Sequence, residues 1–398
     1  MNAVLWSIVG LMRKLFEALS FTPHMGREIK LTDVAVVIAA RNEELALPFC
    51  LKAVTAIVPA SNVFVGDDAS FDTTAKVASE LGCKVFSART NMGKSKILDA
   101  TIKEFRLCDE FSAILILDAD SQIDTNFLRN ALPILSQRNV AVVAGHFVSR
   151  KPAGGFSFGH IIHLYRKRLY FVLQTFFRFG QSWEPINFSI VAPGFASLYR
   201  ADVIAKLNIA EPGLIIEDIN MTFEVHKKRL GRIAYSPTVR CTTEDPTTLR
   251  DYSKQMKRWS LGLWQTISKQ GIWPSKFWLF LTLYLIEILV HAMSITMLAA
   301  ITVVTLYFSG MREFWVPSVN GFFQVPIFYL PFILLLTDIF VSALTSLFTR
   351  DWRILFYSPL FPIMRAIDIF WLLATIPLAW TTKSDGRWNS PERRMHLK

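Results

Sequence analysis

Three long apolar runs in the last third of this 398-residue chain constrain its fold more than any other feature of the sequence. A helix of about 20 predominantly apolar residues is long enough to cross a bilayer. The first run covers residues 277–308, the second residues 325–348 and the third residues 354–380. The first two are long and apolar enough to cross, so the sequence predicts transmembrane α-helices within residues 277–380.

The third run differs from the others because prolines and charged residues interrupt it, among them Pro359, Arg365 and Asp368. If all three runs crossed, the basic tail at residues 381–398 would lie across the membrane from the domain that precedes the runs. The positive-inside rule instead places such a tail in the cytoplasm. A third run that is re-entrant or interfacial would keep the tail on the same side of the membrane as the preceding domain. Such a segment is allowed where its backbone is buried in protein. The number of spans and the side of the tail therefore stay open.

Residues 33–150 alternate short apolar strands with helical patterns. Nearly continuous apolar strands are typical of parallel strands that are covered on both faces. The alternation therefore predicts an α/β fold with a mostly parallel sheet and right-handed crossovers. Such sheets bind ligands beyond the carboxyl ends of their strands. The predicted strands are Val34–Ala40, Val63–Gly66, Lys84–Ser87, Ala113–Leu117 and Val140–Ala144, and the predicted helices are Glu43–Ala56, Thr73–Leu81, Lys94–Phe105 and Asn126–Leu135.

Two further segments are predicted to lie at the membrane surface. Residues 1–32 place apolar side chains at helical spacing, but charges such as Arg13 and Lys14 interrupt them, so the segment suits an amphipathic interfacial helix better than a span. Residues 156–180 mix aromatic side chains with basic ones such as Arg166, which also suits an interfacial helix. The alternatives are a helix docked on the domain for the first segment and a buried helix with snorkelling basic tips for the second.

Polar clusters follow the ends of the predicted strand patterns. One acidic pair at a strand end fits turn chemistry or a helix cap. Several such clusters in one α/β domain are harder to explain in that way and favour a binding site. The clusters are Arg41-Asn42-Glu43, Asp67-Asp68-Ala69-Ser70, Asp118-Ala119-Asp120, Glu217-Asp218 and Gln255-Met256-Lys257-Arg258-Trp259.

The pair Asp118 and Asp120 has the spacing of a cation site. Residues two apart in an extended segment face the same side, so both carboxylates can approach one cation. Mg²⁺ and Mn²⁺ prefer oxygen ligands and often share them with substrate phosphates. Two solvated turn aspartates are the alternative explanation for this pattern, which is common by chance.

Taken together, the clusters resemble the motifs of the family 2 glycosyltransferases, over roughly residues 33–265. Within that family the chain looks like the processive, membrane-integrated synthases of bacterial polysaccharides and hyaluronan. The stretch Trp388–Arg393 looks like the end of the poly-N-acetylglucosamine synthases. The resemblance implies a GT-A type nucleotide-sugar-binding domain on the cytoplasmic side of the membrane. The matching stretches are Ala40-Arg41-Asn42-Glu43, Asp67-Asp68-Ala69-Ser70 with Asp72, Gly93-Lys94, Leu98-Asp99-Ala100 (the family usually has asparagine at Asp99), Leu117-Asp118-Ala119-Asp120, Glu217-Asp218, and Gln255 with Arg258 and Trp259.

The resemblance implies a donor site for a UDP-sugar. Asp68 would accept a hydrogen bond from the uracil ring, and Asp67 would shape that loop. Asn42 and Glu43 would line the same pocket, although capping of a helix start explains Glu43 equally well. Lys94 would lie near the nucleotide or the sugar.

The diphosphate of the donor would be bound by a cation and an arginine. Asp120 would hold Mg²⁺ or Mn²⁺, and Asp118 would face the ribose or the donor sugar. Arg258 would pair with the diphosphate, to which a planar guanidinium is well matched. The cation would stabilise negative charge on the departing UDP.

The remaining motifs are assigned to chemistry and to the acceptor. Asp218 would be the general base that takes the proton of the acceptor hydroxyl, with inversion at the anomeric carbon. Glu217 would support Asp218 or cap the following helix. Trp259 would stack on the acceptor sugar, and Gln255 would hydrogen-bond it or position the loop. The alternative, structural roles are a helix cap for Asp218 and core packing for Trp259.

The sequence therefore predicts a membrane-bound, inverting glycosyltransferase, multi-pass in the plasma (inner) membrane, that extends a β-linked polysaccharide from a UDP-sugar. One alternative is an enzyme that adds a single sugar to a lipid acceptor, and another is a membrane scaffold with a dead transferase domain. An accessory membrane subunit is a candidate partner, and the donor sugar stays open. Nucleic acid is not an expected partner, because Lys and Arg near the membrane explain the net charge of +11 better.

Overall fold

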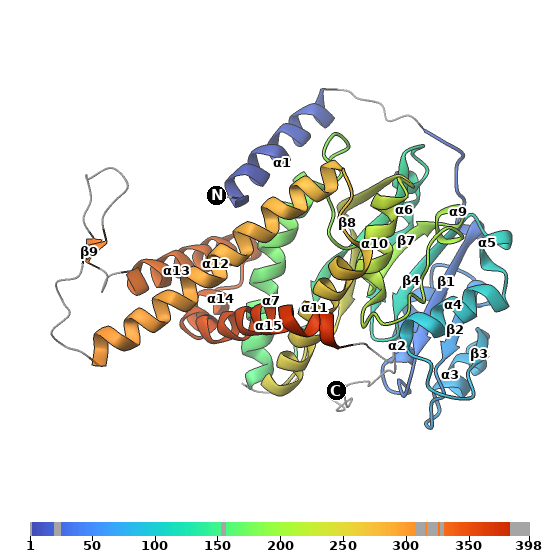
Figure 1. Cartoon of the computed structure of the whole chain (residues 1–398). Helices are drawn as coiled ribbons and strands as arrows, with labels where there is room; N and C mark the ends of the chain where they lie inside the picture. The colour runs from blue at the N-terminus through green and yellow to red at the C-terminus, as the bar shows by residue number, and fades with distance from the viewer. Residues whose placement is uncertain are drawn as a thin grey trace.

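A computed structural model of the protein describes residues 2–19, 25–152, 157–307, 315–316, 325–326 and 330–382. It places an α/β domain at one end of the molecule and a group of long helices at the other (Figure 1). The stretch Trp388–Arg393 lies outside the described residues, as does most of the basic tail predicted at residues 381–398.

The α/β domain is built on one eight-stranded sheet in the order β3-β2-β1-β4-β7-β6-β8-β5. The first four strands in this order are parallel, as predicted. Beyond β4 the sheet is mixed, because β7 runs antiparallel to both β4 and β6, and β5 runs antiparallel to β8. The strands are β1 (Val34–Ala40), β2 (Val63–Asp67), β3 (Lys84–Ser87), β4 (Ala113–Asp118), β5 (Gln122–Ile123), β6 (Val140–Ser149), β7 (Ala196–Arg200) and β8 (Arg232–Thr243); a separate hairpin pairs β9 (Trp315–Val316) with β10 (Val325–Pro326).

The core lies on both faces of this sheet. Every residue of β1 is buried, and alternate residues belong to two separate apolar clusters. Val36 packs in one cluster and Val37 in the other, as expected for a strand whose side chains point to opposite faces. The helices of this domain are α2 (Leu47–Thr55), α3 (Thr74–Glu80), α4 (Lys94–Glu104), α5 (Leu107–Glu110), α6 (Phe127–Leu135), α9 (Ala201–Ile204), α10 (Glu217–Lys227) and α11 (Leu249–Gln270), with short 3₁₀ turns η1 (Leu31–Asp33) and η2 (Ala60–Asn62).

The strand register brings the predicted polar clusters to one edge of the sheet. Asp67 pairs with Ala40 across β2 and β1, and Asp118 pairs with Ala39 across β4 and β1. The carboxyl ends of three neighbouring parallel strands therefore meet at one place, which is where such sheets bind ligands.

Two predicted strand ends are corrected by the structure. Ile215 and Ile216, which precede the Glu217-Asp218 cluster, do not form a strand. Glu217 is the first residue of helix α10. The segment Gln255–Trp259 lies inside the long helix α11 and not after a strand. Helix α2 also begins later than predicted, at Leu47, because the preceding residues form a turn that starts at Asn42 with a φ of 53°.

The segment predicted as an interfacial helix at residues 156–180 is instead mostly packed inside the protein. It forms α7 (Phe158–Val172), a π-helical turn η3 (Leu173–Arg178) and α8 (Phe179–Gln181). Arg166 and Arg168 are both buried, and each forms an ion pair with a buried aspartate. Pairing of this kind lets basic side chains lie in a protein interior, so the buried alternative describes α7.

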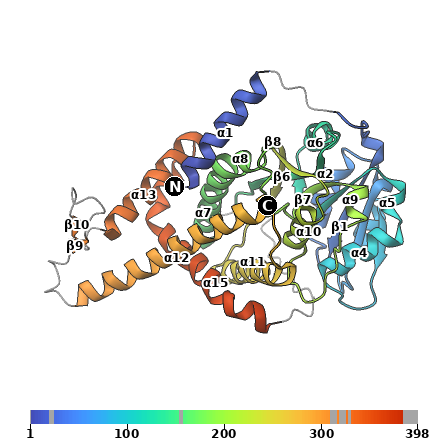
Figure 2. The same cartoon turned by 45° about the horizontal axis from the view of Figure 1, so that its top comes forward.

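The N-terminal helix α1 (Asn2–Ala18) lies against η3 and α8 (Figure 2). Trp6 and Arg13 face inward, and Arg13 donates to the carbonyl of Phe179 at 2.7 Å. The apolar stripe of the helix is exposed instead of buried. Its members are Leu5, Ile8, Leu11, Met12, Leu15 and Phe16.

Two segments of the described chain are long and apolar enough to cross a membrane, Lys276–Met297 in the first predicted run and Arg353–Thr381 in the third. This differs from the prediction, because the part of the second run that the structure describes as an apolar helix, Leu335–Thr349, is shorter. Prolines interrupt the third apolar run as predicted, because Pro359 lies in a 3₁₀ turn that separates two helices, and Pro362 lies in the first turn of the second helix, where proline is tolerated. The long helices of this part are α12 (Lys276–Tyr307), α13 (Leu330–Thr349), α14 (Arg353–Tyr357) and α15 (Phe361–Thr381), with a 3₁₀ turn η6 (Ser358–Leu360) before α15.

Candidate active site

Lys94 joins three elements at the carboxyl edge of the sheet. It is the first residue of α4 and follows Gly93, whose φ of 89° turns the chain into the helix. Its Nζ lies 2.7 Å from Asp118 Oδ1 at the end of β4 and 2.7 Å from Glu217 Oε1 at the start of α10. The predicted donor residues Lys94 and Asp118 and the predicted catalytic residue Glu217 are therefore in direct contact.

Gly194 completes this group and was not identified from the sequence. A Cβ added there would lie 2.8 Å from Lys94 Nζ and 3.2 Å from Glu217 Oε1, so a side chain at this position would require the Lys94 ammonium to shift. The Gly194 N–H donates to Asp218 Oδ2 at 2.9 Å. The one signal in the sequence is the Pro193-Gly194 pair, which marks a turn but says nothing of its neighbours.

Asp218, the predicted base, lies in the first turn of α10. Burial and the negative charge of Glu217 raise its pKa to about 6, against the opposing effects of Lys94 and of the N–H groups of Gly194 and Ile219. A carboxylate with a pKa near 6 is ionised at neutral pH and still basic enough to accept a proton. The first turn of a helix also accommodates its charge.

The neighbouring charges act on one another. Burial lowers the pKa of Lys94, but the carboxylates of Asp118, Glu217 and Asp218 outweigh it, so the pKa of this ammonium is raised and it stays charged. Burial raises the pKa of Asp118, with a further increase from the charge of Asp120 and an opposing effect from Lys94. Burial also opposes ionisation of Glu217, but its contact with Lys94 lowers the pKa overall.

Asp68 is fully buried and holds the loop that precedes α4. Its two carboxylate oxygens accept hydrogen bonds from the backbone N–H groups of Met92 at 2.6 Å and Gly93 at 3.0 Å. The guanidinium of Arg41 donates to the Asp68 carbonyl. Asp67, also buried, accepts from the N–H of Ser70 at 3.2 Å within the loop that follows β2.

Asn42 and Glu43 lie beside that loop. The side-chain oxygen of Asn42 accepts from the N–H of Phe71 at 3.1 Å, and the N–H of Glu43 donates to the Thr74 hydroxyl at 2.8 Å. The N-cap position of α2 is Ala46 and not Glu43. The structure thus brings together the four donor-site residues predicted from the first two clusters.

The carboxylates at the end of β4 suit a hard divalent cation. Within the described part of the chain, no group of three or more His, Cys, Asp or Glu side chains could hold a metal ion. Mg²⁺ is commonly held by one or two carboxylates, with substrate phosphates and water as the other ligands. The charge of Asp120 raises the pKa of Asp118, so a cation between the two would relieve their repulsion. Asp118 and Asp120 therefore fit such an ion.

The predicted acceptor residues lie on α11 and share one partner. The guanidinium of Arg166 lies 5.2 Å from the ring centroid of Trp259 and donates to the side-chain oxygen of Gln255. Arg258 is exposed on the same helix, and its charge is close enough to lower the pKa of Glu217.

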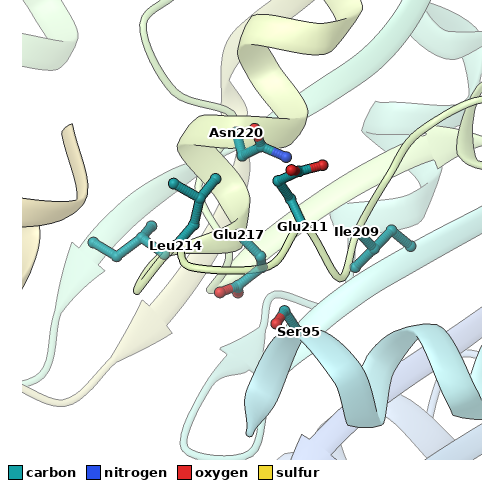
Figure 3. A pocket seen from close by; sticks show the side chains of 7 residues that line it. Ser95, Ile209, Glu211, Leu214, Glu217 and Asn220 are labelled. Carbon is teal, nitrogen blue, oxygen red and sulfur yellow. The ribbon is translucent and has the colours of Figure 1, made fainter. Parts of the chain in front are cut away.

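A narrow hollow with essentially no room for a water molecule lies beside Glu217. It is lined by the first turns of α4 and α10 and by the segment before α10 (Figure 3). In Figure 3 the carboxylate of Glu217 points toward Ser95 of α4. The hollow therefore adjoins the group formed by Lys94 and Glu217.

The sequence of residues 32–262 matches the family model described as glycosyltransferase like family 2. The chain is a family 2 glycosyltransferase. The match covers every polar cluster from Asn42 to Trp259 and ends within α11. It therefore assigns the α/β domain and leaves the C-terminal helices unassigned.

Curated relatives include the hyaluronan synthase of Streptococcus pyogenes, which is 27% identical over 267 residues. That alignment covers 62% of this chain and 59% of the synthase, so the glycosyltransferase spans about three fifths of the length of the relatives it matches.

Among solved structures, the mannosyltransferase PcManGT from Pyrobaculum calidifontis, in complex with GDP-Man and Mn²⁺, has a TM-score of 0.58 at 15% identity. The comparison covers 95% of this chain and 98% of the mannosyltransferase. At this identity the likeness concerns the fold, and it confirms the predicted GT-A type architecture.

Proposed function

We propose that this glycosyltransferase moves a sugar from a UDP-sugar to a growing β-linked polysaccharide, similar to poly-N-acetylglucosamine, with inversion at the anomeric carbon. The observation that carries the proposal is the Asp218 carboxylate, whose pKa is raised to about 6 and whose Oδ2 is held by Gly194. It lies beside Lys94, Glu217 and Asp118 at the carboxyl edge of the sheet, which is where folds of this kind bind their ligands.

Asp218 would remove the proton of the acceptor hydroxyl as that oxygen attacks the anomeric carbon. The new C–O bond forms as the bond to the UDP oxygen breaks, so the configuration inverts. A positioned base of this kind contributes about 10²–10⁴ in rate. Lys94 would balance the negative charge that gathers between the donor phosphates and the carboxylates of Asp118 and Glu217.

Asp120, with Asp118 beside it, would hold Mg²⁺ or Mn²⁺. The ion would supply Lewis-acid stabilisation of the charge on the departing UDP. Support comes from the oxygen donors at the end of β4 and from the fold relative PcManGT, which was solved with Mn²⁺. Asp67, Asp68, Asn42 and Glu43 would form the wall of the nucleotide pocket.

The membrane arrangement follows from the contacts of the long helices. Helix α12 runs away from the α/β domain and α13 returns toward α7 (Figure 1). Helix α15 instead lies along α11, where Trp264 donates to the Leu372 carbonyl at 2.9 Å and Gln265 to the Thr382 carbonyl at 2.8 Å. We infer that α12 and α13 cross the membrane while α15 lies at its surface, with the α/β domain in the cytoplasm.

The exposed apolar stripe of α1 supports a surface contact at the same side of the membrane. An amphipathic helix with such a stripe lies in the interface, with its apolar side chains among the acyl chains. This retains the prediction that the N-terminal segment is interfacial.

The test is product formation by the full-length purified chain from a panel of UDP-sugars and GDP-mannose. A polymer that lengthens with time from one UDP-sugar would support the proposal. No sugar transfer from any donor, with folded protein, would contradict it.

A second candidate is addition of one sugar to a lipid acceptor. The favouring observation is the small number of membrane segments, since two segments of the described chain are long and apolar enough to cross a membrane. It predicts a single lipid-linked product, or GDP-mannose as donor, in the same panel.

A further inference from the structure

Arg166 is a buried arginine that contacts both acceptor residues proposed above. It lies in the middle of α7, outside every motif recognised in the sequence. Its NH1 donates to the side-chain oxygen of Gln255, and its NH2 donates to the Tyr170 hydroxyl at 3.3 Å. Its Nε lies 2.8 Å from Asp245 Oδ1, so its charge is neutralised inside the protein.

Three aromatic rings surround the same guanidinium. Its carbon lies 5.2 Å from the ring centroid of Trp259, 5.3 Å from that of Tyr170 and 5.4 Å from that of Phe147. A guanidinium over an aromatic face is attracted to the ring, and more strongly when it is desolvated. The contacts come from α7, α11 and β6, so Arg166 joins three elements.

We propose that Arg166 is the positioning residue of the acceptor site. It holds the amide of Gln255 and one face of the Trp259 ring, so that the other face of the ring and the amide NH₂ are presented to the acceptor sugar. This inference rests on the proposed glycosyl transfer and adds a residue to it.

The chemistry of the two partners sets what each can offer. A side-chain amide has one acceptor oxygen and one donor nitrogen. Because the Gln255 oxygen accepts from Arg166, its nitrogen is the group left to donate to a sugar hydroxyl. In the described part of the chain no other ring or cation contact involves Trp259, which is partly exposed. Its second face therefore suits the flat apolar side of a sugar.

The residues on either side of Arg166 anchor α7 to the C-terminal helices. The Tyr165 hydroxyl donates to Asp368 Oδ2 on α15 at 2.6 Å. Lys167 Nζ lies 2.7 Å from Asp351 Oδ2, and Arg168 NH1 lies 2.9 Å from Asp338 Oδ2 on α13. Arg166 is thus the member of this run that faces α11, and its place is set by helices proposed to lie in or on the membrane.

Arg166→Lys is the test variant, because lysine keeps the charge beside Asp245 but lacks the planar fork that reaches Gln255 and Trp259 together. The matched control is Lys167→Met on the same helix. Lys167 touches neither acceptor residue, and its partner Asp351 keeps two contacts with Arg353, at 2.7 and 2.8 Å.

The full chain in nanodiscs is assayed with the sugar nucleotide that the wild type uses, following both transfer to the wild-type oligomeric product and hydrolysis to UDP. For Arg166→Lys we expect an acceptor KM about tenfold higher, from a lost hydrogen bond and a weakened ring contact. Donor hydrolysis and UDP affinity by calorimetry should stay at wild-type values. Lys167→Met should behave as the wild type.

A double-mutant cycle separates positioning from general packing. If Arg166 acts through Trp259, then Arg166→Lys should add little in a Trp259→Ala background. Additive effects, or equal losses of hydrolysis and transfer with a lower melting temperature, would overturn the proposal in favour of a structural role. A wild-type chain that hydrolyses and transfers no sugar nucleotide would instead refute the underlying glycosyl transfer.

Discussion

At the scale of single residues, the raised pKa of Asp218 gives the proposed base a pH signature. Burial and the charge of Glu217 raise this pKa from 3.8 to about 6, so the base is protonated and inactive below that pH. We expect transfer to rise through pH 6 to a plateau, and Asp218→Asn to lower it by about 10² or more while UDP still binds. Kinetics and calorimetry measure these two effects. A parallel collapse of UDP affinity would make Asp218 a structural residue.

The raised pKa of Asp218 also means that ionisation of this carboxyl, which activates the base, lowers the stability of the folded protein. The neutral form of Asp218 is the one favoured by folding, so its contribution is present below pH 3.8 and lost as pH rises through about 6. Asp218→Asn mimics that neutral form and is therefore expected not to lower the melting temperature at pH 7. This outcome distinguishes loss of a base from loss of the fold.

Gly194 is a residue whose role depends on the absence of a side chain. In Gly194→Ala the new Cβ would lie 2.8 Å from Lys94 Nζ, and Lys94 would have to move away from Asp118 or Glu217. We expect transfer to fall at least about tenfold, because misplacing a charged group in a site is costly to rate. Wild-type activity in steady-state assays of this variant would show that the close contact is not needed. Gly10→Ala, at a helical glycine where an added Cβ would lie 3.4 Å from its nearest neighbour, a side-chain carbon of Phe179, is a control for the substitution itself.

The cation proposed at Asp120 is tested by removal and return. Chelation should abolish transfer, and Mn²⁺ or Mg²⁺ should restore it, because the charge on the departing UDP is then stabilised. Asp120→Asn should stay inactive at all metal concentrations while retaining its melting temperature. Full activity in excess chelator would remove the metal from the mechanism.

At the scale of elements, α7 is attached to α13 through a shared aspartate. Asp338 is 3% exposed and pairs with both Arg168 and Arg365. Asp338→Ala leaves the buried Arg168 without its carboxylate, which is expected to cost about 3 kcal/mol or more. The thermal midpoint in detergent measures the loss. Glu80→Ala, which removes an exposed ion pair with Lys76, should change stability by less than about 0.5 kcal/mol.

At the scale of the whole molecule, packing of α15 along α11 places the end of α15 beside the α/β domain. If α15 lies at the surface, Thr382→Cys should be labelled by a membrane-impermeant maleimide from the same side as Phe71→Cys, which is on an exposed loop of the domain. Vesicles of known orientation and a Cys108→Ser background provide the assay, since the other native cysteines are buried. Labelling from opposite sides would show that α15 crosses the membrane.

The sequence by itself determined the parallel half of the sheet and the residues gathered at its edge. Strands β1 to β4 could be predicted because the length and pattern of their side chains are local properties of the sequence. Asp67 and Asp118 end two of these strands. The resemblance to the family 2 glycosyltransferases likewise predicted that Lys94, Glu217 and Asp218 belong to one site.

The tertiary structure decided what depends on contacts between distant segments. The antiparallel strand β7 inserts between β4 and β6, a pairing that no local pattern encodes. Gly194 matters only because Lys94 of α4 and Glu217 and Asp218 of α10 converge on it from two helices. Arg166 was predicted to lie on an interfacial helix because basic and aromatic side chains alternate there, and it is buried because Asp245, distant in the sequence, supplies the compensating charge.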